Sequence, residues 1–401
     1  MPPDALTGTD GGAPAPPATG APGPDDRLTG LPAGGRPGRR FGWVLRPAVI
    51  YVLSRVVTVG TIAVCSPLSG VSMSGEIDRW DSRWFLRAAV DGWPRHVPPG
   101  AGPAVRSTIA FFPVFPLTIR WLSDLTGLSP LTCGLVVGWT SGLTAMIGVW
   151  ALVRHYADPA AADRATLLVA VFPGSFILSL VYAEGMAITF VAFGLLALMR
   201  RRWVTAGVLG LLATATTPIA LAFVVSCAWC AYREVSRHRD WRSLAAPVLS
   251  PLGFVAFQVW LWRHTGSLLA WRLTERNGWD SYPSIAYPVH LVVVFVRDPV
   301  ATTITGDVLF VGIVAAVFGV VVAVRTRLPL PLLLYAVAAV TLGLVSAPVG
   351  LRPRFVFLAF PLIIAVGTWL RGRPYVIVVS VSVVLLAAVT AYSVTSWAVF
   401  P

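Results

Sequence analysis

Charged side chains beside aromatic residues occur in three short stretches of the sequence, with spacings that suit chemistry on a polar substrate. The densest stretch runs from Glu76 to Arg87 and contains Asp81 between Trp80 and Trp84. A carboxylate that aromatic rings partly shield from water suits the role of a general base. Such a stretch is equally typical of an interfacial anchor, in which tryptophan rings lie at the depth of lipid headgroups. Both interpretations stay open at this point.

The second and third stretches are shorter. Tyr182 and Glu184 lie between two apolar runs with almost no loop, where Glu184 is either part of a site or a favourable charge at a helix N-terminus. Arg352 and Arg354 flank a proline at the start of another apolar run. Since planar guanidinium groups bind phosphate through two hydrogen bonds, we predict an anion-binding pair here.

The composition places these residues in a membrane protein. The chain has 401 residues, of which 56% are hydrophobic and only 12% charged, whereas soluble domains carry roughly 25% charged residues. This excludes a soluble enzyme and a nucleic-acid-binding protein, in spite of a formal net charge of +13. Residues 1–40, rich in Pro, Gly and Ala, are predicted to be a disordered cytoplasmic tail. Residues 41–401 are predicted to form one all-α polytopic membrane domain.

Apolar runs near the length of about 20 residues that a bilayer requires predict the spanning helices. We expect eleven, at residues 46–65, 131–154, 165–182, 185–200, 203–215, 218–232, 244–263, 306–324, 329–346, 354–370 and 375–397. The N-terminal side and the loops assigned to the cytoplasm then hold 18 of the 31 arginines, in agreement with the positive-inside rule. We therefore predict a multi-pass plasma-membrane protein with a cytoplasmic N-terminus, an outer C-terminus and the polar stretches on the outer face.

Three segments are exceptions to a simple series of spans. Residues 107–126 are apolar, but two prolines and two charges favour a helix in the outer interface, within the outer loop 66–130. Residues 203–232 are interrupted at Thr216–Pro218, so we expect two half-helices that meet near the outer surface. Arg55 lies inside the first span, where it either satisfies helix carbonyl groups or contacts substrate.

No motif for a soluble nucleotide or a resident metal occurs in the sequence. Neither G-x-x-x-x-G-K-[ST] nor G-x-G-x-x-G is present, and the histidines show no ligand spacing. Cys227 and Cys230 lie in an apolar run without a nearby histidine and are expected to be packing thiols. We expect no cofactor, although Asp78 and Asp81 leave a divalent cation possible.

Four groups of residues, taken in order, resemble the motifs of the PIG-V-like mannosyltransferase family. They are Arg79-Trp80-Asp81-Ser82 with Trp84-Phe85-Leu86 and Gly92; Ala110-Phe111-Phe112-Pro113 with Phe115-Pro116-Leu117; Phe172-Pro173-Gly174-Ser175 followed by Tyr182 and Glu184; and Arg354-Phe355 with Phe360-Pro361-Leu362. The chain departs from the family at Thr217, which precedes Pro218 where an arginine is common.

The resemblance implies the GT-C membrane architecture and an inverting transfer of a sugar, typically mannose, from a polyprenyl-phosphate donor on the outer face. It implies that Asp81 is the catalytic base, that Glu184 is the second catalytic carboxylate, and that Arg354 lies near the donor phosphate. The side chains expected to bind substrate are Arg79, Trp80, Trp84, Tyr182, Arg352 and Arg354. The partners are then membrane lipids, the lipid-linked donor and an acceptor that is a glycan, a glycolipid or a protein.

Two alternatives come from other classes of protein. A transporter or flippase of lipid-linked saccharides has many spans too, but it needs a polar path across the membrane, for which Arg55 is the one strong candidate in the sequence. A non-catalytic scaffold retains the fold without the chemistry. An enzyme requires Asp81, Glu184 and Arg354 to converge on one outward-facing site.

Overall fold

The computed structural model describes residues 42–297 and 304–396, and within these ranges the regular secondary structure is helical apart from one short β-pair. The predicted tail, residues 1–40, lies outside the described residues. The elements are α2 (Gly42–Ser69), α3 (Met73–Ile77), α4 (Asp81–Val90), η2 (Pro103–Val105), η3 (Thr108–Ala110), α5 (Val114–Thr126), α6 (Pro130–Arg154), α7 (Pro159–Ala170), η4 (Pro173–Ser179), α8 (Glu184–Met199), α9 (Trp203–Thr214), η5 (Pro218–Leu221), α10 (Ala222–His238), η6 (Trp241–Leu244), α11 (Ala245–Leu249), α12 (Leu252–Thr265), α13 (Ala270–Trp279), β1 (Tyr282–Pro283), α14 (Ala286–Arg297), α15 (Ile304–Arg325), α16 (Leu330–Leu344), β2 (Ser346–Ala347), α17 (Pro353–Leu358), α18 (Phe360–Trp369) and α19 (Gly372–Thr395).

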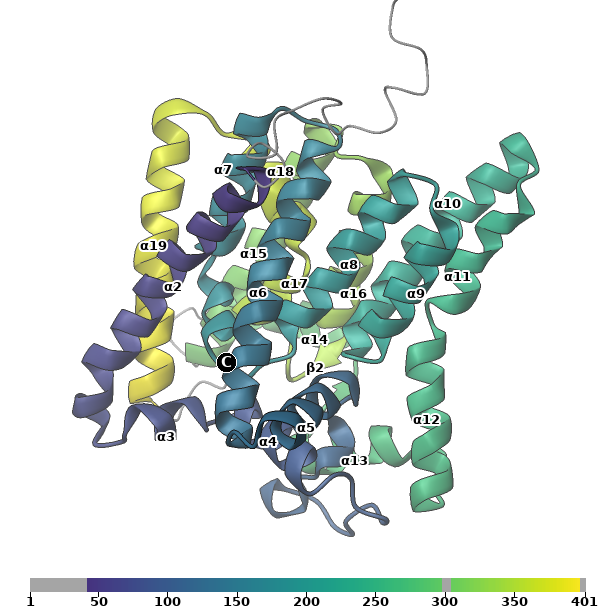
Figure 1. Ribbon diagram of the computed structural model, residues 1–401. Coiled ribbons are helices and arrows are strands. Elements are labelled where there is room, and N and C mark those ends of the chain that lie inside the picture. Colours follow the sequence, from purple (N-terminus) through teal and green to yellow (C-terminus); the bar gives the residue numbers. More distant parts are fainter. Residues whose placement is uncertain (1–41, 298–303, 397–401) are drawn as a thin grey trace, which may run out of the picture.

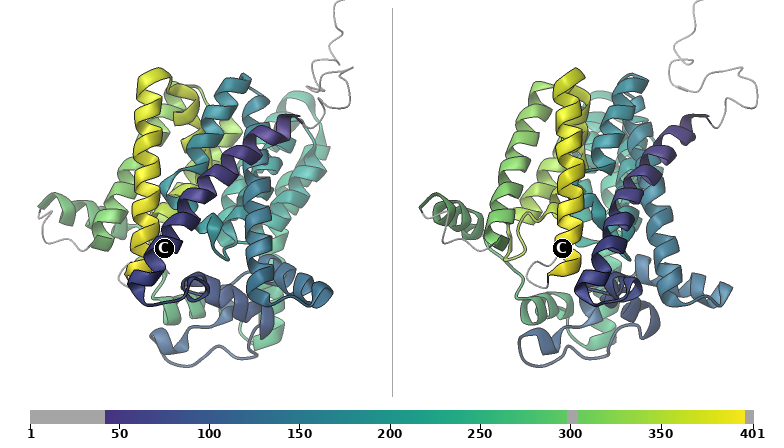
Figure 2. Two further views of the ribbon diagram at one scale, coloured as in Figure 1. Left: turned by 60° about the vertical axis from the view of Figure 1, so that its left-hand side comes forward. Right: turned by 90° about the vertical axis from the view of Figure 1, so that its left-hand side faces the viewer.

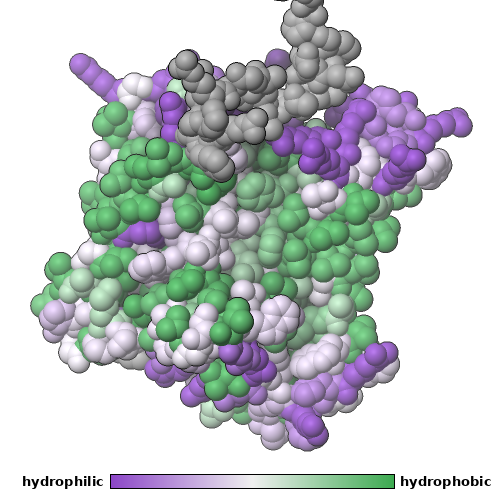
Figure 3. Space-filling model, in the orientation of Figure 1, coloured by the Kyte–Doolittle hydropathy of each residue, from purple (hydrophilic) through white to green (hydrophobic). Residues whose placement is uncertain are grey.

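The helices form a bundle and a layer across one end of it (Figure 1). The end layer consists of α3, α4, α5 and α13, whereas the long helices run along the bundle. α2 and α19 lie side by side in both views of Figure 2, and α14 extends away from the bundle. On the visible face of the bundle, a hydrophobic band lies between hydrophilic surfaces at the two ends (Figure 3). This distribution is that of a protein whose bundle crosses a membrane.

All eleven segments predicted to span the membrane contain helices. Five helical stretches in the described ranges are long and apolar enough to cross a bilayer on their own, namely Trp43–Ser69, Pro130–Arg154, Pro218–His238, Gly306–Arg325 and Gly372–Thr395. Two further predicted spans are bent pairs, α7 with η4 and α11 with α12. The other four correspond to the shorter apolar helices α8, α9, α16 and α18. The chain is therefore an all-α polytopic membrane protein.

The predicted span 165–182 is not one continuous helix. α7 ends at Ala170, and η4 continues from Pro173 at an angle of 76°. Pro173 has no N–H group to donate within a helix and disfavours helical backbone at the residue before it, Phe172. The break leaves carbonyl groups without helical partners inside the bundle.

Arg55 of α2 satisfies these carbonyl groups. Its Nη2 donates to the Ala170 carbonyl at 2.9 Å and its Nη1 to the Ser175 carbonyl at 2.6 Å. Nη1 also donates to the Ser179 hydroxyl at 3.1 Å, and Nε to the Ser54 hydroxyl at 3.3 Å. The predicted role of Arg55 in satisfying carbonyl groups is therefore confirmed, and its nitrogens are all engaged within the protein.

The break predicted between residues 203 and 232 is also confirmed. α9 ends at Thr214, and η5 begins at Pro218. The Ala215 carbonyl accepts a hydrogen bond of 3.2 Å from the backbone N–H of Val114, at the start of α5. The two half-helices thus meet against the end layer, in which α5 lies as expected for the amphipathic segment 107–126.

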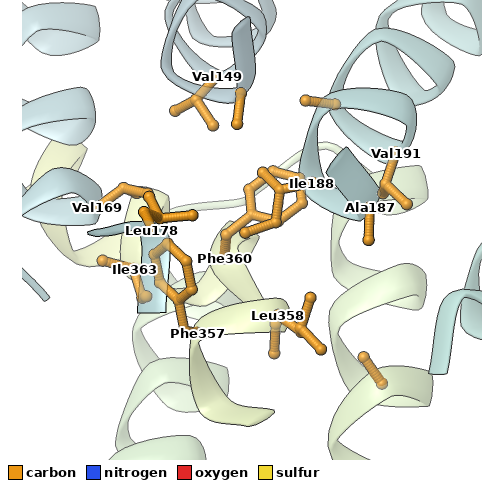
Figure 4. Packing of buried hydrophobic residues seen from close by; sticks show 14 of the residues in the cluster. Val149, Val169, Leu178, Ala187, Ile188, Val191, Phe357, Leu358, Phe360 and Ile363 are labelled. Atoms are coloured by element: carbon orange, nitrogen blue, oxygen red, sulfur yellow. The ribbon is translucent and has the colours of Figure 1, made fainter. Parts of the chain in front are cut away.

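Aromatic residues of α17 and α18 anchor the bundle core. Phe357 and Phe360 are fully buried and project among residues of α6, η4 and α8 (Figure 4). The Tyr335 hydroxyl of α16 donates to the Leu358 carbonyl at 2.9 Å, where α17 gives way to α18. Because this packing fixes the inner end of α17, it also fixes the opposite end of that short helix, where Arg354 lies.

Candidate active site

Asp81 is the first residue of α4, at the surface of the end layer that faces the bundle. The preceding Trp80 has φ of 56°, in the left-handed region, so the chain turns sharply into the helix. The backbone N–H of Asp81 donates to the Tyr182 hydroxyl at 3.4 Å. The Tyr182 ring packs edge-on against Phe85, one turn further along α4, with centroids 6.4 Å apart.

Arg354 is positioned by a close contact between η4 and α17. A Cβ atom built on Gly174 would overlap the Pro353 carbonyl and the Arg354 N–H, so the two backbones touch there. Phe172 stacks on Phe357 one turn further along α17, with the ring planes 10° apart. The Phe172–Ser175 motif therefore acts as the support on which the start of α17 rests.

The site brings Arg354 together with two carboxylates. Its Nη1 donates to the Asp81 carboxylate, and it lies 4.0 Å from Oε1 of Glu184. The Arg354 guanidinium also lies over the Tyr182 ring, 5.8 Å from its centroid. The side chains of Arg354 and Glu184 are 13% and 12% exposed, while that of Asp81 is 24% exposed. The three residues predicted to converge do converge, at the junction of the bundle and the end layer.

Two polar atoms in this cluster, Arg354 Nε and Glu184 Oε2, are buried and have no hydrogen-bond partner among the described residues. Buried polar groups are nearly always paired in folded proteins. The cluster therefore retains hydrogen-bonding capacity for a polar ligand that the protein itself does not satisfy.

Four further residues predicted to bind substrate occupy different positions. Arg79 is buried, pairs with Glu76 and donates to the Val394 carbonyl of α19. The indole N–H of Trp80 donates to the Ser393 carbonyl of the same helix at 3.4 Å. These two side chains attach the start of α4 to the end of α19, and substrate contact by them remains a prediction.

Trp84 and Arg352 border the site. Trp84 stacks on Phe111 and meets the edge of Trp279 of α13, with centroids 6.3 and 5.4 Å apart. Arg352 caps the start of α17; burial lowers its pKa to about 10, with the like charge of Arg354 as the next cause. Arg352 thus stays charged at neutral pH.

Glu275 of α13 is a carboxyl group that the sequence analysis did not single out. It lies in the electrostatic field of both Asp81 and Arg354. Burial, followed by repulsion from Asp81, raises the pKa of Glu275 to about 8, against a smaller opposing effect of Arg354. A signal was present in the sequence, since Ala270, Thr274 and Gly278 at helical spacing mark a buried face beside it.

Within residues 42–297 and 304–396, no three His, Cys, Asp or Glu side chains lie close enough together to hold a metal ion. Cys227 and Cys230 are free thiols, and the Cys227 sulfur lies 3.3 Å from the Ser250 hydroxyl inside the bundle. The positive charge beside the carboxylates of this site comes from arginine.

Solved structures share this arrangement of helices. ArnT from Cupriavidus metallidurans, bound to undecaprenyl phosphate, aligns with a TM-score of 0.50 and 13% identity, over 89% of this chain and 76% of that one. The apo oligosaccharyltransferase of Archaeoglobus fulgidus aligns with a TM-score of 0.51 and 14% identity, over 91% of this chain. This chain has the GT-C fold.

The similarity to these two solved structures is one of architecture alone, because both sequence identities are low. The chain spans 57% of the length of the archaeal oligosaccharyltransferase. No protein-family model matches the chain, and no curated protein matches it in sequence.

Proposed function

We propose that this protein is an integral membrane glycosyltransferase that moves a sugar, mannose, from a polyprenyl-phosphate donor to an acceptor hydroxyl on the outer face of the membrane, with inversion. The observation that carries the proposal is the pairing of Arg354 with Asp81 and Glu184 at the junction of bundle and end layer. This arrangement combines a site for an anionic leaving group with a carboxylate base.

The reaction needs one base and one phosphate-binding group. Asp81 accepts the proton of the acceptor hydroxyl as the hydroxyl oxygen forms a bond to the anomeric carbon. The bond between that carbon and the phosphate oxygen breaks, and its electron pair leaves with the polyprenyl phosphate. Because the sugar gains oxocarbenium character in the transition state, the nearby carboxylates also stabilise it electrostatically.

Arg354 has N–H groups that can donate hydrogen bonds to the departing phosphate. In the structure its Nη1 donates to the Asp81 carboxylate, and its Nε is buried without a hydrogen-bond partner in the described part of the chain. An arriving phosphate competes with Asp81 for the guanidinium and so releases the carboxylate to act as base. Arg352, two residues away at the start of α17, adds a second charge for the same phosphate.

The resemblance to PIG-V-like mannosyltransferases supports the choice of mannose and of a polyprenyl-phosphate donor. The undecaprenyl phosphate in the solved ArnT structure is a lipid of the same class, bound to a protein of the same fold. A donor that diffuses laterally in the bilayer needs no nucleotide pocket, which agrees with the missing phosphate-loop motifs.

The proposed orientation has the described start of the chain on the cytoplasmic side and the site outside. α2 begins at the end of the bundle opposite the end layer, whereas α19 ends beside it (Figure 1). The arginine-rich ends of α6, α8 and α10 lie away from the end layer, which supports this orientation by the positive-inside rule. The flippase alternative receives no support from Arg55, because its nitrogens are bonded within the protein.

The donor class is tested with the purified full-length protein in liposomes. Radiolabelled polyprenyl-phosphate-mannose, polyprenyl-phosphate-glucose and GDP-mannose are each offered with octyl mannoside as acceptor, with and without EDTA. We expect transfer from polyprenyl-phosphate-mannose alone and no loss of transfer in EDTA. Transfer from the nucleotide sugar, or from none of the three, would contradict the proposal. Loss of transfer in EDTA that Mn²⁺ restores would contradict the expectation that no divalent cation is needed.

A further inference from the structure

Glu275 lies on a helix whose position in the end layer is fixed from several directions. The Gly102 N–H donates to the Asn277 carbonyl at 2.8 Å, and Arg106 Nε donates to the Gly278 carbonyl at 3.1 Å. After α13 the chain forms β1, which pairs with β2 just ahead of α17, with Tyr282 opposite Ala347. α13 is thus tied both to the loop of the end layer and to the segment that leads to Arg354.

A ring contact between α13 and α4 places Glu275 within the electrostatic influence of Asp81. Trp279 meets Trp84 with ring centroids 5.4 Å apart. Glu275 precedes Trp279 by four residues, and Asp81 precedes Trp84 by three, so each carboxyl group lies on the contacting face of its own helix. The two carboxyl groups, from two helices, therefore lie beside the same aromatic cluster of Trp84, Trp279 and Phe111.

The Glu275 carboxyl makes no hydrogen bond or ion pair with the described part of the chain, yet it is partly buried. Asp81 on α4 and Arg354 on α17 are the charged groups that act on it. Among the other charged groups of the neighbouring elements, Arg106 is bonded to Gly278, and His264 of α12 is bonded to the Trp93 carbonyl. With its pKa raised to about 8, the Glu275 carboxyl carries a proton at neutral pH and can both donate and accept a hydrogen bond.

We propose that Glu275 binds a second hydroxyl group of the acceptor, next to the hydroxyl that Asp81 deprotonates, and that the acceptor is therefore a polyhydroxylated ring, a sugar or a cyclitol. This assignment rests on the proposed glycosyl transfer and names its acceptor class. A serine or threonine side chain has one hydroxyl and leaves Glu275 without a partner. Binding sites with a buried polar group discriminate against ligands that fail to pair with it.

The test compares two acceptors in liposomes supplied with polyprenyl-phosphate-mannose. Octyl mannoside offers several neighbouring hydroxyl groups, and 1-octanol offers one. We expect the Glu275→Ala variant to raise the KM for octyl mannoside about tenfold, while the KM for octanol and the rate of donor hydrolysis without acceptor stay unchanged. Arg272→Ala, on the exposed side of α13, is the matched control.

The conservative variant distinguishes binding from a merely structural role. Glu275→Gln retains a donor and an acceptor, so near-normal KM is expected at pH 7. The wild-type KM is expected to rise as the pH passes 8, and the KM of this variant is not. Equal losses with both acceptors, or an unchanged KM for octyl mannoside in Glu275→Ala, would overturn the assignment. Wild-type protein that neither transfers mannose nor hydrolyses the donor would overturn the proposed function itself, and this assignment with it.

Discussion

Arg354 donates a hydrogen bond to the carboxylate of Asp81, although 273 residues separate them in the chain. One residue begins the helix α4 of the end layer, and the other lies in the first turn of α17 in the bundle. Their contact joins the two parts of the molecule at the point where the proposed reaction takes place. A phosphate that enters this junction would separate Arg354 from Asp81 and bind a guanidinium group that is already in position.

Replacement of Arg354 should impair use of the donor. The Arg354→Ala variant is expected to raise the donor KM about 10- to 100-fold, because a hydrogen bond to a charged group contributes about 1.5–3 kcal/mol. Arg354→Lys keeps the charge but not the planar fork, and should show a smaller loss. The measurement is initial transfer rate against donor concentration, with the exposed Arg83→Ala as control. A donor KM equal to that of the wild type in Arg354→Ala would count against the phosphate role.

A methyl group at Gly174 should disturb the site without touching a substrate. The Gly174→Ala side chain would collide with the Pro353 carbonyl and so displace the start of α17. We expect at least a tenfold loss of transfer and a lower melting temperature. Gly60→Ala on α2 is the matched control, because its Cβ meets open space and alanine favours a helix by about 1 kcal/mol. If both variants transfer equally well, the close contact between η4 and α17 is not needed for activity.

Arg55 should contribute to stability. Arg55→Met leaves the Ser175 carbonyl without its partner in the bundle, at an expected cost of about 1–3 kcal/mol in the free energy of unfolding. Arg46→Met on the same helix is the control, since the Arg46–Asp163 pair is exposed and such pairs contribute about 0–1 kcal/mol. Thermal unfolding in detergent measures both variants. Equal melting temperatures for the two would show that the Arg55 hydrogen bonds are not important for the broken segment.

Glu275 should make stability depend on pH in the neutral range. Its pKa is raised from 4.5 to about 8 in the folded protein, so between these values the folded state holds a proton that the unfolded chain loses. The free energy of unfolding therefore falls as pH rises through this window. Glu275→Gln should remove that contribution, so the difference in melting temperature between variant and wild type grows from pH 5 to pH 8. A constant difference would contradict the raised pKa.

The sequence predicted the membrane architecture because length and apolarity decide which segments cross a bilayer. It predicted the convergence of Asp81, Glu184 and Arg354 from local charge patterns and a family resemblance. The bend after Ala170 was missed, although Pro173 marks it, since the apolar run continues through the proline. The bend depends on backbone hydrogen bonding, and hydropathy carries no information about backbone hydrogen bonds.

Contacts that depend on packing between distant segments could not be predicted from the sequence. The carbonyl groups of Ser393 and Val394 accept hydrogen bonds from Trp80 and Arg79. Because every residue has a backbone carbonyl group, the sequence does not indicate which one will accept such a bond. The proximity of Glu275 to Asp81 was not predicted for a related reason, because it depends on how α13 lies relative to α4. Such relationships require the three-dimensional arrangement of the end layer.

The most direct test of the account is single-turnover transfer by the Asp81→Asn variant, reconstituted in liposomes at the protein level and melting temperature of the wild type. Asparagine retains the size of the side chain but cannot take the acceptor proton, and general-base catalysis contributes about 10²–10⁴-fold. We predict a loss of that size in the rate of mannose transfer, with donor binding preserved. A rate equal to that of the wild type would contradict the assignment of Asp81 as the base.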